Sequence, residues 1–211
     1  MEKKDGSIAK TKSIFRSFVL ADIITLANAS CGMAGIFLCL NQASGTRGPY
    51  FWVVFVLLPL ALVCDILDGF VARRLANHSP LGADLDSLAD VVSFGVAPAV
   101  LGFTLGLRGL WDVLILIYFV VCGISRLARF NVTAPSLADR TGKVKYYEGT
   151  PIPTSIVIVA LLGIAYWLDC IDTHILFGSF RIGRWALHPF AIVYAISGSA
   201  MTSSTIRIPK P

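Results

Sequence analysis

Residues Asp65 to Asp90, DILDGFVARRLANHSPLGADLDSLAD, decide how this chain folds and what it can bind. The stretch carries four carboxylates inside or beside otherwise apolar segments, at Asp65, Asp68, Asp86 and Asp90. A charged side chain at membrane depth is costly, so an acid in such a place indicates a functional site. We therefore expect these four acids to face one another and to hold cations between them.

The spacing of the acids predicts two facing helices. Asp65 and Asp68 lie three residues apart, and Asp86 and Asp90 lie four apart, so each pair shares one face of its helix. A short segment that contains a proline, at 78–80, joins the two helices and places the pairs across a gap. Because these ligands are hard oxygens, with no Cys or His among them, the site suits Mg²⁺ or Mn²⁺.

A purely structural role is open for each acid taken alone. The second pair could be acids favoured by the dipole at a helix N-terminus, and the first could pair with Arg73 and Arg74. This interpretation does not account for the whole set, because two arginines cannot neutralise five nearby acids, Asp84 included, inside a membrane.

The composition predicts a polytopic membrane protein of the all-α class. Of the 211 residues, 55% are hydrophobic and 15% are charged, and the mean hydropathy is +0.73. The net charge of +5 is not gathered into a basic stripe with interleaved aromatic residues, which argues against a nucleic-acid-binding protein.

We expect six transmembrane helices, at about 20–42, 50–76, 83–106, 109–131, 152–170 and 185–205, in one membrane domain over 20–211. Residues 1–19 are expected to form a cytosolic tail with an interfacial amphipathic segment. The third and sixth helices are rich in Gly, Ala and Ser, which lets helices approach closely.

The distribution of Lys and Arg predicts the orientation. With a cytosolic N-terminus, the far side of the membrane keeps only Arg47, Arg108, Arg181 and Arg184. Both ends of the chain and the acidic hairpin then face the cytosol, and water-soluble substrates enter from that side.

The acidic stretch also resembles a known signature. The pattern D-x-x-D-G-x-x-A-R, eight residues, G-x-x-x-D-x-x-x-D is that of the CDP-alcohol phosphotransferases. The chain matches every fixed position, at Asp65, Asp68, Gly69, Ala72, Arg73, Gly82, Asp86 and Asp90. Eight residues at fixed gaps make a specific signal. The resemblance implies attack of an alcohol on a CDP-linked phosphate with release of CMP, two Mg²⁺ or Mn²⁺ ions in each site, and a homodimer.

The resemblance also implies roles for individual residues. Asp65, Asp68 and Asp86 are expected to be metal ligands, and Asp90 to be the general base and a possible ligand of a second metal. The residues expected to contact the CDP-linked substrate are Thr25, Asn28, Gly69, Ala72, Arg73, Ser79 and Gly82. Interhelical hydrogen bonding is the alternative for Thr25 and Asn28, and an ordinary turn role is the alternative for Ser79.

Three further stretches, DSLADVVSFGVAPA, RLARFNV and EGTPIPTS, resemble the phosphatidylserine synthases of this superfamily, and KVKYYEGTPIPTS resembles their fungal membrane form. This resemblance implies CDP-diacylglycerol and L-serine as substrates, and residence in the endoplasmic reticulum. The expected serine-binding residues are Arg126, Arg129, Phe130 and Asn131, because an arginine supplies hydrogen-bond donors for the serine carboxylate. Membrane anchoring by snorkelling is the alternative role of the two arginines.

Two other functions are open at this point. The same fold could use a different acceptor, such as inositol, inositol phosphate, glycerol phosphate or ethanolamine. A divalent-cation transporter is an alternative from another class, but an arginine such as Arg73 beside the path would repel the ion.

Overall fold

The computed structural model of the protein describes residues 20–43, 50–75, 82–137, 146–171, 178–182, 185–203 and 207–209. In this part of the chain, four helical stretches are long and apolar enough to cross a membrane. They are α1 (Leu20–Ala43), α2 (Tyr50–Leu75), the third span formed by α3 (Gly82–Asp90), η2 (Val91–Val96) and α4 (Ala97–Leu105), and α5 (Leu110–Leu137). The expected tail at 1–19 lies outside the described residues.

Two shorter apolar helices complete the helical part: α6 (Ile156–Trp167), which continues the 3₁₀ turn η3 (Ile152–Ser155), and α7 (Ala191–Thr202). The predicted fold class, an all-α polytopic membrane protein, is confirmed. Short antiparallel strand pairs accompany the helices, β1 (Tyr146–Glu148) with β4 (Arg207–Pro209) and β2 (Phe180–Ile182) with β3 (Trp185–Leu187).

The last two helices are shorter than the sequence predicts. The helix expected from 185 begins at Ala191, because residues 185–187 form β3 against β2. The helix expected to reach 170 ends at Trp167, where Asp169 takes a φ of 54° and the backbone N–H of Cys170 donates to the carbonyl of Ala165. This bonding pattern closes the helix with a Schellman motif.

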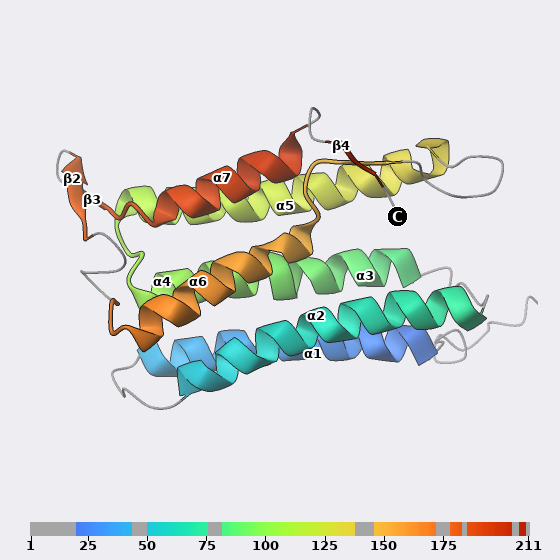
Figure 1. The fold of residues 1–211 in the computed structure, drawn as a ribbon, viewed down its shortest axis with the longest axis horizontal. Coiled ribbons are helices and arrows are strands. Elements are labelled where there is room, and N and C mark those ends of the chain that lie inside the picture. Colours follow the sequence, from blue (N-terminus) through green and yellow to red (C-terminus); the bar gives the residue numbers. More distant parts are fainter. Residues whose placement is uncertain are drawn as a thin grey trace, which may run out of the picture.

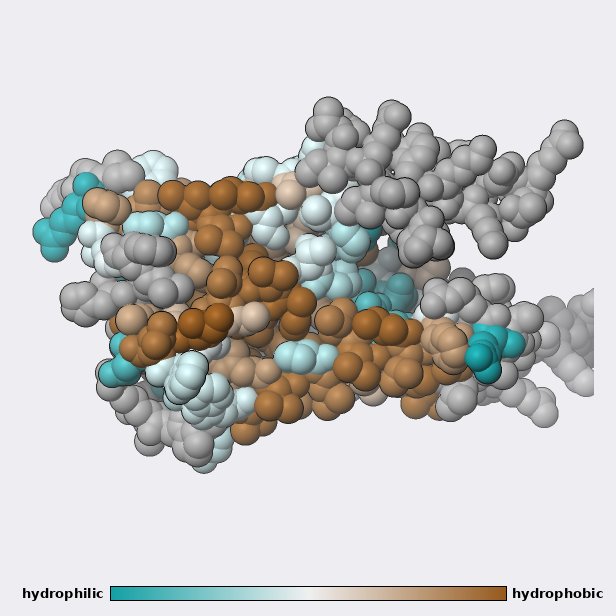
Figure 2. Space-filling view, in the orientation of Figure 1, coloured by the Kyte–Doolittle hydropathy of each residue, from teal (hydrophilic) through white to brown (hydrophobic). Residues whose placement is uncertain are grey.

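Helix α1 contacts all the helices of the acidic half of the molecule. It packs along α2 and also against α3, η2 and α4, while α7 lies on α5 and α6 contacts both α2 and α4 (Figure 1). The largest fully buried side chains include Leu58, Phe94, Phe119 and Tyr194, so one core joins the helices. Apolar side chains also cover much of the outer surface along α2 and α6 (Figure 2), as expected of a surface that meets lipid.

A π-helical segment, η2, interrupts the third span directly after Asp90. Ser93 Oγ in this segment donates a hydrogen bond to the carbonyl of Asn28 at 2.9 Å. A Cβ on Gly32 would lie 2.8 Å from the Cα of Ser93, so only glycine permits this approach of α1 to η2. Ser93 of the third span and Gly32 of α1 thus serve packing within the chain.

Candidate active site

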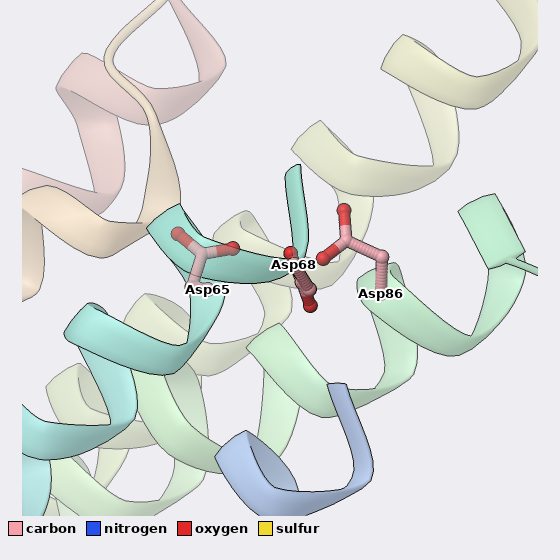
Figure 3. A group of neighbouring side chains, drawn as sticks. All are labelled: Asp65, Asp68 and Asp86. Carbon is pink, nitrogen blue, oxygen red and sulfur yellow. The ribbon is translucent and has the colours of Figure 1, made fainter. Parts of the chain in front are cut away.

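Asp65 and Asp68 project from α2 toward Asp86 on α3 (Figure 3). One carboxylate oxygen from each of the three residues lies within 4.8 Å of the other two. An ion such as Mg²⁺, with ligand distances of about 2.1 Å, spans oxygens up to about 4.2 Å apart. A small closure of the side chains therefore suffices for a shared cation.

An unpaired carboxylate oxygen of Asp86 supports a bound cation at this place. Its Oδ1 is buried and has no hydrogen-bond partner. A buried polar oxygen without a partner is costly, and a carboxylate oxygen more so. The residues present therefore fit a divalent metal ion held by Asp65, Asp68 and Asp86.

Helix α1 positions one acid from each of the two acidic helices. Thr25 Oγ1 donates to Asp68 Oδ2 at 2.6 Å, and Asn28 Nδ2 donates to Asp90 Oδ1 at 3.4 Å. Thr25 is 5% exposed and Asn28 is fully buried. The interhelical role that the sequence left open for these two residues is therefore present. Contact of either residue with a nucleotide stays a prediction.

Asp90 belongs to the same cluster although it lies one turn deeper on α3. Its carboxyl group is buried and interacts with those of Asp65, Asp68 and Asp86. The two acidic stripes thus face each other as the spacing predicts. Whether Asp90 acts as a base stays a prediction.

The remaining residues of the signature flank this cluster. Gly69 and Ala72 follow Asp68 on α2, both partly buried, and Gly82 is the first residue of α3. Arg73 belongs to α2, but its side chain lies outside the described part of the structure, and so does Ser79.

The residues predicted to bind serine lie on α5, and a side-chain hydrogen bond connects α5 to α3. Asn131 Nδ2 donates to Ser87 Oγ at 3.0 Å, and Ser87 directly follows Asp86. Arg126 is buried, 7% exposed, with its guanidinium 5.5 Å from the centre of the Phe130 ring. Ser87 was not predicted from the sequence, where its only signal is its position next to Asp86 of the signature.

Arg129 has a different environment from Arg126. Its Nη2 donates to the carbonyl of Thr202, the last residue of α7, at 3.0 Å. A cation at this position satisfies a free carbonyl and offsets the negative end of the helix dipole. The two predicted serine-binding arginines are therefore not equivalent in the structure.

The fold and the site therefore define an all-α membrane protein with a cluster of acids, from two spans, whose arrangement suits a divalent cation. The chain belongs to the CDP-alcohol phosphatidyltransferase family, whose sequence model matches residues 18–196. Members of this family generally use divalent metal ions, in keeping with the acidic cluster.

Several relatives share most of the matched region. The CDP-diacylglycerol–serine O-phosphatidyltransferase of Saccharomyces cerevisiae is 43% identical over 204 residues, which are 94% of this chain and 73% of the yeast protein. The archaetidylserine synthase of Methanothermobacter thermautotrophicus is 36% identical over 71% of this chain and 59% of its own length. The CDP-diacylglycerol–serine O-phosphatidyltransferase of Bacillus subtilis is 32% identical over 68% of this chain and 75% of its own.

Proposed function

We propose that the protein transfers the phosphatidyl group of CDP-diacylglycerol to the hydroxyl of L-serine, giving phosphatidylserine and CMP. The observation that carries this proposal is the convergence of carboxylate oxygens from Asp65, Asp68 and Asp86 within 4.8 Å in a membrane fold. The names of the yeast and Bacillus relatives support serine as the acceptor.

The acidic cluster is the place where the donor substrate binds, through the metal ions that the acids would hold. Asp65, Asp68 and Asp86 would hold Mg²⁺ or Mn²⁺, and Asp90, four residues after Asp86 on α3, would contribute to a second ion. When bound, the metal offsets the negative charge of the diphosphate. Thr25 fixes the carboxylate of Asp68, and Gly69 leaves room for the nucleotide beside the backbone of α2.

The transfer itself requires only one proton acceptor from the chain. Asp90 takes the proton of the serine hydroxyl while the serine oxygen forms a bond to the lipid-bearing phosphorus. The bond from this phosphorus to the CMP oxygen breaks, and CMP leaves with the electron pair. Asn28 holds Asp90 in position through its 3.4 Å hydrogen bond.

We assign the serine carboxylate to Arg126 and give Arg129 a positioning role. The guanidinium of Arg126 is buried beside the Phe130 ring, and its planar shape matches the geometry of a carboxylate. Arg129 donates to the carbonyl of Thr202 at the end of α7, which supports a positioning role. Asn131 joins α5 to the acidic helix through Ser87, which keeps the acceptor side close to Asp86.

We further propose that the acidic half faces the cytosol, that the protein resides in the endoplasmic reticulum, and that it forms a homodimer. The bias of Lys and Arg supports the orientation. An apolar groove of about 380 Å³, between the end of α1, α4 and α5, supports a helix-packing interface. The groove is lined in part by Leu40, Val100, Phe103 and Ile117.

Purified protein in lipid–detergent micelles tests the proposal directly. Incubation with CDP-diacylglycerol, Mg²⁺ or Mn²⁺ and L-serine should release CMP and form phosphatidylserine. Inositol, inositol phosphate, glycerol phosphate and ethanolamine, offered separately, should release far less CMP. Faster release with any of these acceptors than with serine would overturn the assignment of the acceptor.

The variant Asp90→Asn tests the assignment of the base. It preserves the shape of the side chain and can still pair with Asn28, but it cannot take the hydroxyl proton. We expect turnover to fall by about 10²–10⁴-fold, the usual contribution of a general base, while nucleotide affinity changes much less. Turnover close to that of the wild-type enzyme would remove Asp90 from the mechanism.

A further inference from the structure

A second cavity lies at the end of the molecule opposite the acidic cluster, where α2 begins and α6 ends (Figure 1). Its volume is about 280 Å³, and it is lined by Phe51, Trp52, Tyr166, Trp167, Asp169 and Ile171. About thirteen residues of helix separate Trp52 from Asp65, which corresponds to roughly 20 Å along α2. Nothing in the proposed transfer reaction uses this cavity.

Aromatic side chains build most of its wall. The Tyr166 ring lies with its centroid 5.2 Å from that of Phe51 and 5.3 Å from that of Trp52, and Trp52 meets it edge to face. Trp167, the last residue of α6, is 75% exposed beside them. Such a cluster offers ring faces, whose negative quadrupole attracts an organic cation.

Asp169 adds a full negative charge at a place where helix stability does not favour one. It occupies the position after the C-cap of α6 with a φ of 54°, where glycine or asparagine is the usual residue. A carboxylate there also meets the negative end of the helix dipole. In the described part of the chain, no Lys, Arg or His forms an ion pair with Asp169. A bound cation would offset the unfavourable interaction of the carboxylate with the helix dipole.

We propose that this cavity binds the ammonium end of a zwitterionic phospholipid headgroup, with Asp169 as its counter-ion and Trp52, Tyr166 and Trp167 as its aromatic wall. The surroundings favour a lipid as the source of the ammonium group. Leu168 and Val53 are exposed next to the cavity, and Figure 2 shows a pale patch at this end of the molecule beside brown apolar surface. A headgroup can therefore enter the cavity while its acyl chains lie along the helices.

Lipid competition tests the proposal. Delipidated protein in detergent is offered an equimolar mixture of phosphatidylcholine and phosphatidylglycerol with identical acyl chains, and the retained lipids are counted by native mass spectrometry. The wild-type protein should prefer phosphatidylcholine by about tenfold, the effect expected of a partly desolvated cation on an aromatic face.

Asp169→Asn should abolish this preference without lowering the unfolding temperature, because asparagine suits the left-handed position. Trp167→Leu should reduce the preference several-fold and leave the unfolding temperature unchanged, because the side chain is exposed. The matched control is Trp185→Leu, an exposed tryptophan on β3 at the same end of the molecule, which should leave the preference unchanged.

An unchanged preference in Asp169→Asn would overturn the proposal, and so would an equal loss in Trp185→Leu. Choline chloride at the concentration of the lipid should not displace it. Displacement would show that the cavity binds soluble ammonium compounds, and the assignment to a lipid would then be wrong.

Discussion

Replacing Thr25 with valine tests how α1 supports the acidic site. Valine keeps the shape of threonine but removes the O–H that lies 2.6 Å from Asp68 Oδ2. A hydrogen bond to a charged group contributes about 1.5–3 kcal/mol, which corresponds to a roughly 10- to 150-fold change in an equilibrium constant. Loss of comparable outer contacts to metal ligands costs about 10- to 100-fold in metal affinity or activity. We therefore expect the metal concentration for half-maximal activity to rise by one to two orders of magnitude.

The assay is CMP release from CDP-diacylglycerol and serine while Mg²⁺ or Mn²⁺ is titrated. Thr25→Ser retains the hydroxyl and should behave nearly like the wild-type enzyme. Thr104→Val is the matched control, because Thr104 is equally buried but donates to carbonyls of its own helix, those of Val100 and Leu101. A wild-type metal dependence in folded Thr25→Val would refute the idea that α1 holds Asp68 in place for the ion.

Three further substitutions separate binding from stability. Arg126→Lys should raise the KM for serine by about tenfold or more without changing metal dependence, whereas Arg129→Gln should mainly lower stability, by about 1 kcal/mol, because it loses its bond to Thr202. Equal KM values for serine in wild type and Arg126→Lys would return this arginine to a structural role. Asp112→Asn should lower the free energy of unfolding by about 3 kcal/mol with little effect on metal dependence, because the buried carboxylate accepts bonds from Gly109 N, His188 N and His188 Nδ1. Denaturant titration measures this change, and an unaltered midpoint would contradict it.

The four long helices and the acidic cluster could be predicted from the sequence for a clear physical reason. Apolar stretches of this length have few other uses, and carboxylates within them must meet a partner. The expected start of α2 at residue 50 agrees with its observed first residue, Tyr50. The spacing of Asp65, Asp68 and Asp86 was sufficient to predict that these acids lie close together on two facing helices.

The contacts between distant segments could not be predicted in the same way. In a nearly uniform apolar helix, hydropathy does not tell which face turns inward. The sequence therefore did not predict that α1 contacts α2, α3, η2 and α4 together. The buried pairing of Asp112 with His188, separated by 76 residues, likewise leaves no local pattern. The strand pair that delays α7 to Ala191 depends on residues 180–182, outside any apolar run.

The π-helical turn of η2 has a consequence for how the third span tolerates sequence change. One residue of α-helix turns the chain by about 100°, and a π turn accommodates one extra residue without continuing that rotation. The half of the span that bears Asp86 and Asp90 and the half that bears Leu101 are therefore phased independently. A single deletion within residues 91–96 would remove the extra residue and leave one continuous α-helix, in which the acids and the core-facing leucines keep their relative directions.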